Sequence, residues 1–315
     1  MRAIQVLGSK KSPKIFLNQC FPKPVLEEAA ILIKVDAAGI TGDEILWPEL
    51  YETPTRIPGH ELSGTISELG PDYRGSLMVG QKVFAFTAAD RGQCHAEYAI
   101  CTANEVAPKP ASISHFEAAA LPIPLLTAFE AILDHGKVMP GIRVLVTGAS
   151  GAVGKIAVQL ITRLAGGHAI ALASLRNHDI LRQLGAQEVI NYAVTDWESK
   201  VDAVDVVFDT VGGMVLKKTW KTIKEDGLII TVGDPPPSWA IKGVQPDEAS
   251  HKPNVQYKYF VVSPNAERLR QASDMIDNGS VKPLVVKPFP FNEAEKAWAY
   301  ARQRGREEKA VVDFM

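Results

Sequence analysis

A glycine-rich turn between an apolar strand and an amphipathic helix most constrains how this chain can fold. Residues 142–146 are an apolar run, and residues 155–165 carry apolar side chains at helical spacing. In such a unit the glycines permit a tight turn, approach of backbone N–H groups to a pyrophosphate, and close helix packing. The alternative is an ordinary glycine turn. The dinucleotide hypothesis predicts these cofactor-binding residues: Gly148, Ala149, Ser150, Gly151, Ala152, Val153 and Gly154.

The 315 residues suffice for about two domains. Residues 1–110 form short apolar runs separated by Gly and Pro turns, which predicts a β-rich region. A short helix from Phe116 should stop at Pro122, and a second should span 125–135. Strands and helices then alternate, which predicts a parallel sheet covered on both faces. Strands are expected at 142–147, 169–174, 188–191, 204–208, 228–232 and 259–262, and helices at 152–165, 177–184 and 214–223.

Composition excludes several classes of function. A net charge of −2 gives no reason to expect nucleic acid or an anionic membrane as a partner. No stretch reaches the roughly 18 apolar residues that a membrane-spanning helix needs, and the N-terminus does not resemble a secretion signal. Cys20, Cys94 and Cys101 form no C-x-x-C pair, which favours a reducing, cytoplasmic compartment.

The end of the second strand of the nucleotide unit indicates which cofactor is bound. An NAD site usually has an acidic residue there for the ribose 2′-hydroxyl, but this chain has Ser174 and Arg176. A hydroxyl and a guanidinium suit a 2′-phosphate. The sequence therefore predicts NADPH, unless Arg176 is only a solvated residue at a helix start.

Several segments, in this order, carry a resemblance to the medium-chain dehydrogenase/reductase superfamily over essentially the whole chain. No single segment is specific, but their order is. They are A-G-I-T-G-D (38–43), P-G-H-E-L-S-G (58–64), V-G-Q-K-V (79–83), A-E-Y (96–98), A-A-L-P (119–122) with T-A-F (127–129), the glycine turn, L-G-A with V-I-N-Y (184–192), F-D-T-V-G (208–212) and K-A-V-V (309–312).

The resemblance implies an α/β protein with two domains. A GroES-like, β-rich catalytic domain would comprise residues 1–118 and 257–315, and a Rossmann domain with a doubly wound parallel sheet would comprise residues 119–256. The active site would lie between them. The resemblance also implies further cofactor contacts, which are Thr127, Tyr192, Val211, Gly212, Val232, Gly233 and Lys309. For Lys309, a solvent-facing role is an equal alternative.

The same resemblance predicts that no metal is bound. Thr41 stands where zinc members have a cysteine ligand, and Ile123 stands at a third ligand position. His60 matches a second ligand, but a catalytic zinc needs about three protein ligands. His60 and Glu61 are therefore expected to make structural hydrogen bonds.

The zinc-free branch resembles quinone and enone reductases, which implies an NADPH-dependent oxidoreductase acting on a small molecule. Such chemistry needs a hydrogen-bond donor at the substrate carbonyl and a proton source. The branch's usual tyrosine is absent from its place, where Leu46 and Trp47 stand. The candidate catalytic residues are Thr41, Asp43, Tyr51 and His60, with a turn or cap role as the alternative for Asp43.

Other hypotheses stay open. The unusual turn at Thr41 and the proline-rich segment 233–254 suit an enzyme of secondary metabolism acting on a natural-product intermediate, even with non-redox chemistry. A non-enzymatic NADPH-binding regulator and a zinc alcohol dehydrogenase are the other two. The edge strand expected at 259–262 could pair in a homodimer, and a monomer with a covered edge is equally compatible.

Overall fold

The computed structural model describes every residue except 195, and the chain divides into two compact units. One unit comprises Met1–Leu126 and Ser263–Met315, and the other comprises Thr127–Val262. The β-rich unit is thus assembled from both ends of the chain, with the α/β unit between them in sequence. Both boundaries between the units fall a few residues later in the chain than the predicted domain boundaries. The first boundary lies within helix α3 (Pro122–Phe129).

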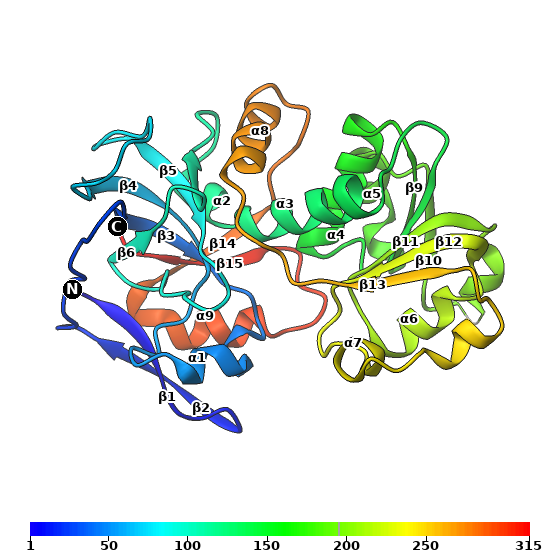
Figure 1. The fold of residues 1–315 in the computed structure, drawn as a ribbon, viewed down its shortest axis with the longest axis horizontal. Helices are drawn as coiled ribbons and strands as arrows, with labels where there is room; N and C mark the ends of the chain where they lie inside the picture. The colour runs from blue at the N-terminus through cyan, green and yellow to red at the C-terminus, as the bar shows by residue number, and fades with distance from the viewer. Residues whose placement is uncertain (195) are drawn as a thin grey trace. The chain divides into compact units, whose positions relative to one another are not determined.

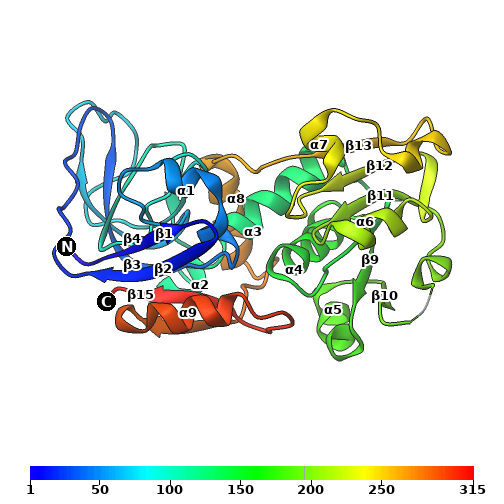
Figure 2. The ribbon, with the colours of Figure 1, turned by 90° about the horizontal axis from the view of Figure 1, so that it is seen from below.

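The middle unit contains a six-stranded parallel sheet in the order β10-β9-β8-β11-β12-β13. Helices lie on both faces, with α4 and α5 on one and α6 and α7 on the other (Figures 1 and 2). The strands are β8 (Arg143–Val146), β9 (His168–Ala173), β10 (Glu188–Asn191), β11 (Val204–Asp209), β12 (Ile223–Thr231) and β13 (Gln256–Tyr259). The helices are α4 (Ala152–Gln159), α5 (His178–Leu184), α6 (Gly213–Thr219) and α7 (Ser238–Lys242).

This strand order is that of a doubly wound dinucleotide-binding sheet, as the sequence predicted. The first strand, β8, lies between β9 and β11, so successive connections leave it in opposite directions. Ligands of such sheets bind outside the carboxyl ends of the strands at this switch point. The glycine turn follows β8 directly, which places it at the switch point.

The buried carboxylate of Asp209 joins the ends of three central strands. One of its oxygens accepts hydrogen bonds from Thr147 Oγ1 (2.5 Å) and Val211 N (3.3 Å). The other accepts from Gly212 N (2.9 Å) and Thr231 Oγ1 (2.6 Å). Thr147 follows β8, and Asp209 and Thr231 end β11 and β12. Each carboxylate oxygen thus has two donors, and the buried charge is fully paired.

The terminal unit is built on a seven-stranded sheet, in which six strands follow the order β14-β15-β3-β4-β5-β7 and β6 pairs with β3, and it has a separate β1–β2 hairpin. Helix α9 packs on β14, β15 and β2, and α2 packs on β3 and β4. The strands are β1 (Ala3–Ser9), β2 (Ser12–Asn18), β3 (Ile31–Gly39), β4 (Glu61–Leu69), β5 (Lys82–Phe86), β6 (Tyr98–Cys101), β7 (Val106–Pro108), β14 (Val286–Pro290) and β15 (Lys309–Asp313). The helices are α1 (Pro48–Glu52), α2 (His115–Ala119), α8 (Ala266–Asp277) and α9 (Ala294–Ala301).

Three expectations about individual elements were wrong. Pro122 begins α3 instead of ending the preceding helix, because proline lacks only an N–H that the first helical residue leaves unpaired. The last parallel strand is Gln256–Tyr259 and not 259–262, since its register against β12 runs from Leu228↔Gln256 to Thr231↔Tyr259. Helix α6 ends at Thr219, and the chain returns to pair Ile223 with Val204.

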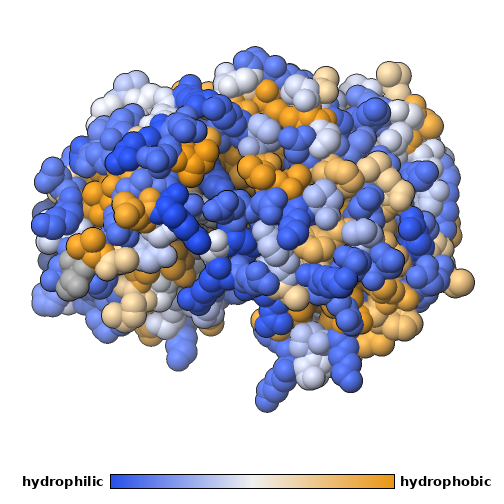
Figure 3. Space-filling model, turned by 180° about the vertical axis from the view of Figure 1, so that it is seen from behind, coloured by the Kyte–Doolittle hydropathy of each residue, from blue (hydrophilic) through white to orange (hydrophobic). Residues whose placement is uncertain are grey.

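On the face seen in Figure 3 the surface is mainly hydrophilic, with separate apolar patches. Within the described residues, no helix has the length and apolar character needed to span a bilayer. Large apolar side chains exposed in the middle unit include Val211, Met214 and Ile241. Scattered exposed apolar residues of this kind are normal for folded proteins.

Asp209→Asn is expected to destabilise the middle unit by about 2–4 kcal/mol. Either orientation of the new amide turns its NH₂ group toward a backbone N–H, of Val211 or of Gly212, and leaves that N–H without its acceptor. Thermal or urea denaturation measures the loss. Asp202→Asn, the same change at an exposed position before β11, is the control. Equal stability of the two variants would contradict the role of Asp209.

Candidate functional site

The predicted cofactor-binding residues of the middle unit lie along one edge of its sheet. The turn from Gly148 to Gly154 follows β8, Ser174 and Arg176 follow β9, and Tyr192 follows β10. Val211 and Gly212 follow β11, and Val232 and Gly233 follow β12. All are at carboxyl ends of parallel strands, where open α/β sheets bind ligands. Thr127 does not follow a strand but is buried within α3.

The glycine turn approaches its surroundings too closely for side chains. Gly148 has a φ of +60°, and a Cβ there would lie 2.3 Å from Thr210 Oγ1. A Cβ on Gly154 would lie 2.5 Å from Gly148 O and 2.6 Å from Ala149 Cα. The third glycine thus lets α4 pack against the turn itself. Helix α4 begins at Ala152 with Gly151 as its N-cap, and Gly151 offers no side chain to satisfy the first N–H groups. Those N–H groups suit phosphate oxygens.

Ser174 and Arg176 lie at the expected place for reading the ribose substituent. Ser174 Oγ accepts a hydrogen bond from Asn177 Nδ2 at 2.9 Å, which leaves the serine proton available to donate. Arg176 is exposed in the short turn between β9 and α5. Tyr192 is also exposed, at 54%. A hydroxyl donor and a guanidinium at the end of β9 fit a phosphate monoester.

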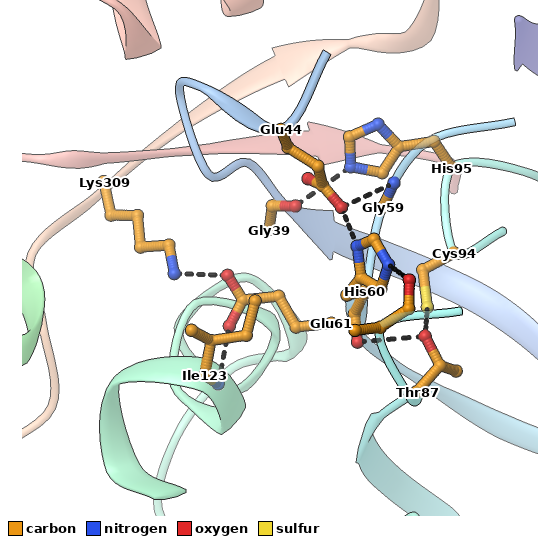
Figure 4. Close-up of polar contacts among 11 residues, drawn as sticks. Gly39, Glu44, Gly59, His60, Glu61, Thr87, Cys94, His95, Ile123 and Lys309 are labelled. Carbon is orange, nitrogen blue, oxygen red and sulfur yellow. Dashed lines mark hydrogen bonds and ion pairs between the residues drawn. The ribbon is translucent and has the colours of Figure 1, made fainter. Parts of the chain in front are cut away.

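In the terminal unit, residues 39–44 connect β3 to a buried ion pair between Glu44 and His60 (Figure 4). Glu44 Oε1 binds His60 Nδ1 and also accepts from Gly59 N at 3.0 Å. His60 Nε2 lies 3.1 Å from Ala89 O. A carbonyl oxygen and an ionised carboxylate only accept hydrogen bonds, so both ring nitrogens of His60 must donate. With Glu44 ionised, His60 is therefore an imidazolium.

The electrostatics agree with this assignment. Burial by itself would lower the pKa of His60, but the charge and hydrogen bond of Glu44 outweigh it and hold the pKa above its ordinary value. Burial would likewise raise the pKa of Glu44, and His60 reverses the direction and lowers it. The ring of Trp47 covers His60, with ring centroids 5.3 Å apart. The pair is thus charged and shielded from water.

Glu61, the next residue, faces the other way and is fully buried. It forms an ion pair with Lys309 and accepts a hydrogen bond from Ile123 N at 3.0 Å, at the start of α3. Burial raises the pKa of Glu61, and Lys309 opposes that effect. Lys309 is itself buried, so its ammonium group is bound to Glu61 and not extended toward solvent. We therefore correct the predicted phosphate contact of Lys309 to this internal ion pair.

The remaining catalytic candidates differ in how free their polar groups are. Tyr51 Oη donates to Ile45 O at 2.8 Å, and burial raises the pKa of Tyr51. Asp43 occupies the N-cap position of a short 3₁₀ turn without a side-chain capping bond. The half-buried Thr41 has no hydrogen-bond partner for its hydroxyl within the described part of the chain. Thr41 and Asp43 therefore keep the polar groups that could meet a ligand, whereas Tyr51 and His60 are engaged.

Zinc does not fit the described residues at this place. His60 uses both nitrogens as donors, Glu61 is bound to Lys309, and Ile123 contributes only its backbone N–H. An imidazolium has no lone pair for a metal, and zinc ligands must be deprotonated. In the part of the chain that the structure covers, no group of three His, Cys, Asp or Glu side chains is placed to hold a metal ion.

Three interactions of the structure were not predicted from the sequence. Glu44 was not connected with His60, although it follows the turn motif directly. Asp209 is an acidic residue at the end of an apolar strand. Its position in the sequence could therefore have indicated a polar role at the carboxyl end of the sheet. The ion pair of Glu61 and Lys309 joins β4 to β15. No local pattern could reveal it, because the two residues lie near opposite ends of the chain.

Comparison with known proteins gives the class. A family model described as "Alcohol dehydrogenase GroES-like domain" matches residues 27–111, and one described as "Zinc-binding dehydrogenase" matches residues 184–312. The structure of the quinone oxidoreductase from Coxiella burnetii is 28% identical, with a TM-score of 0.87, and the match covers 100% of this chain and 99% of that chain.

Two relatives by sequence match most of the chain. The "NADPH-dependent alkenal/one oxidoreductase, chloroplastic" of Arabidopsis thaliana is 29% identical over 303 residues, with 92% of this chain and 73% of the relative covered. The "Probable zinc-binding oxidoreductase, mitochondrial" of Arthroderma benhamiae is 28% identical over 312 residues, with 93% and 91% covered. The chain belongs to the medium-chain dehydrogenase/reductase superfamily, in its quinone and enone reductase-like branch. It is an oxidoreductase that uses a nicotinamide cofactor and acts on a small molecule.

Gly151→Ala is expected to leave stability unchanged and to raise the Kd for NADPH about tenfold. Its Cβ would lie 3.2 Å from Gly148 O, a contact that a small shift relieves, but the methyl group would occupy the surface offered to phosphate. Gly154→Ala should lower both stability and affinity, because its Cβ meets backbone atoms at 2.5 Å and 2.6 Å. Fluorescence titration and thermal unfolding separate the two effects. Wild-type affinity in Gly151→Ala would contradict the phosphate role.

The Glu44–His60 pair should stabilise the terminal unit in a pH-dependent way. The raised pKa of His60 means that its contribution is complete below the unfolded value, about 6.5, and is lost as pH rises through the folded value. The lowered pKa of Glu44 means that its contribution is complete above about 4.5 and is lost as pH falls. Removing one partner should cost about 3–5 kcal/mol near pH 6.

A double-mutant cycle of Glu44→Gln and His60→Gln, followed by thermal unfolding between pH 5 and pH 9, measures this coupling. The coupling should shrink toward pH 9. The control is the half-exposed pair of His168 and Glu188, which should couple weakly at any pH. A coupling between Glu44 and His60 no larger than that of the control pair would disprove the buried ion pair.

Proposed function

We propose that the chain is an NADPH-dependent, zinc-independent reductase that delivers hydride to an enone, a quinone or a related carbonyl-activated double bond. The observation that carries the zinc independence is the bonding of His60, whose two ring nitrogens both donate to protein oxygens. The names of the Coxiella and Arabidopsis proteins support the quinone and enone substrates. The phosphate-compatible groups Ser174 and Arg176 support NADPH.

Bound at the edge of the sheet, NADPH would supply the hydride. The turn and the start of α4 would bind its diphosphate, and Ser174 with Arg176 would bind the 2′-phosphate. Without a metal, the substrate carbonyl must be polarised by a hydrogen-bond donor while charge develops on its oxygen. We assign that role to the Thr41 hydroxyl, which has no partner elsewhere in the described residues. Asp43, two residues later in the same turn, is the candidate to orient the water that supplies the proton.

The direct test follows NADPH oxidation at 340 nm with a panel of enones and quinones, in the presence and absence of a chelator. We expect turnover that the chelator does not change and a purified protein with far less than one zinc per chain. Thr41→Val should lower kcat at least tenfold, since one donor to an oxyanion is worth about two to three orders of magnitude. Thr41→Ser should retain most activity. Zinc-dependent turnover would refute the proposal, and cofactor binding without turnover would favour the regulator hypothesis.

Arg176→Ala should raise the KM for NADPH about tenfold and leave the KM for NADH unchanged, because only NADPH carries the 2′-phosphate. Steady-state kinetics with each cofactor measures the split. Arg182→Ala is the control, since this arginine lies on the following helix and makes only a surface contact with Asp179. An equal effect of Arg176→Ala on both cofactors would contradict the assignment.

We further propose a cytoplasmic homodimer. Cys20, Cys94 and Cys101 are free thiols, which suits a reducing compartment. In the described sheet β13 pairs only with β12, so its outer edge could pair with a second copy.

The segment 233–254 carries α7, where Trp239 packs on Tyr257 at 5.1 Å. That segment is where a specialised substrate of secondary metabolism would be recognised.

A further inference from the structure

The segment that follows α9 lies against the turn that carries Thr41 and Asp43. A Cβ on Gly42 would lie 2.4 Å from Ala301 O and 3.4 Å from Arg302 N. The two stretches therefore touch through their backbones, with no room for a side chain between them. The segment that begins at this contact, residues 302–308, includes Arg302, Arg304 and Arg306. Of these arginines, Arg306 is close enough to Asp43 of the turn to interact with its charge.

Arg306 is half-buried, but it holds no carboxylate. Its Nη1 donates to Gln303 O at 2.9 Å, and within the described residues it makes no ion pair. Among the other half-buried arginines, Arg2, Arg91 and Arg143 are each paired with a glutamate, namely Glu97, Glu105 and Glu188. Half-buried Arg56 instead resembles Arg306, because it donates to a backbone carbonyl, Gly8 O, at 2.8 Å. Burial lowers the pKa of Arg306 below its ordinary value, yet a guanidinium remains charged in proteins. Arg306 is thus a partly desolvated cation with unused N–H donors.

The neighbouring acidic groups do not use these donors. Asp43 acts on Arg306 through its charge, but the two side chains form no ion pair in the structure. Glu308 accepts the hydrogen bond of Tyr300 Oη at 3.1 Å. Lys287 lies over the ring of Tyr300, 4.4 Å from its centroid, and adds further positive charge on that side. A guanidinium with free, coplanar N–H groups binds carboxylates and phosphates in bidentate fashion.

We propose that Arg306 binds an anionic group of the substrate, a carboxylate or a phosphate, and thereby makes the enzyme selective for anionic enones or enoyl thioesters. This inference rests on the proposed function, because it places the substrate at the turn of Thr41 and Asp43. It goes beyond that function by naming a chemical feature of the substrate away from the reacting double bond. Binding energy from such a remote group can be used to position the reacting atoms.

Matched substrates test the inference without any variant. 4-Oxopent-2-enoate and 3-penten-2-one share one enone, and only the first carries a carboxylate. Crotonyl-coenzyme A and crotonyl-N-acetylcysteamine share one thioester, and only the first carries phosphates. We expect kcat/KM to be at least tenfold higher for the anionic member of one pair, as suits a charge-assisted hydrogen bond. The pair that shows the preference identifies carboxylate or phosphate as the group. No preference in either pair would overturn the proposal.

Variants locate the effect. Arg306→Gln should raise the KM for the anionic substrate about tenfold and leave kinetics with its neutral partner unchanged, and Arg306→Lys should lose less. Arg304→Gln, an exposed arginine of the same segment, should behave like wild type. Equal losses for charged and neutral substrates would mean that Arg306 is structural, and the proposal would fail.

Calorimetric titration of the anionic compounds into the protein with NADP⁺ separates the two hypotheses. If no compound is reduced, the proposed function fails. In that case binding of 4-oxopent-2-enoate or crotonyl-coenzyme A that Arg306→Gln weakens would still support the anion site, and absence of binding would overturn it. If neutral enones are reduced without an anionic preference, the proposed function stands and the role of Arg306 falls.

Discussion

The middle unit depends on the hydrogen bonds that the buried carboxylate of Asp209 accepts from the ends of neighbouring strands. The glycine turn, Val211 with Gly212, and Val232 with Gly233 all leave strands whose ends meet on this one group. A displacement of any of these strand ends would leave part of a buried charge unpaired, and that is costly in a low dielectric. The sheet edge is therefore held in one arrangement before a cofactor arrives, which reduces the ordering that binding must supply.

A second buried charge arrangement, between His60 and Glu44 in the terminal unit, is the one on which the proposed zinc-independent reaction rests. Where zinc members of the superfamily are expected to hold a divalent cation, this chain holds a protonated His60 against Glu44. The positive charge of the site thus comes from a proton. That charge is internal to the fold and neutralised there, so it does not act on a substrate oxygen as a Lewis acid would. In the proposed reaction, polarisation of the substrate therefore falls to hydrogen-bond donors such as Thr41.

Much of the fold could be predicted from local patterns, because the glycine turn, the alternation of strands and helices, and the ordered motifs are all encoded over short stretches. The order of the sheet confirms the Rossmann prediction made from them. What could not be predicted depends on contacts between distant residues. The sequence left a phosphate contact and a solvent-facing role equally open for Lys309, because Glu61, its partner, is distant in sequence. It also predicted a helix end at Pro122, whereas the preceding helix ends at Ala119 and Pro122 begins the next one. For the site, residue types suggested candidates, and only hydrogen bonding separated Thr41 from Tyr51 and His60.

The pairing of β3 with β15 has a consequence for how the protein is made. Gly39 and Ala38 lie opposite Val311 and Val312, so the first large sheet is completed by the last strand of the chain. The ribosome synthesises the whole middle unit after β3 and before β15. The middle unit can therefore form its own parallel sheet while the edge of β3 that pairs with β15 is still open. The turn at residues 39–44 also waits for the segment after α9, which packs against Gly42. The turn of Thr41 and Asp43 is thus synthesised early but is completed only when the segment that carries Arg306 has been made.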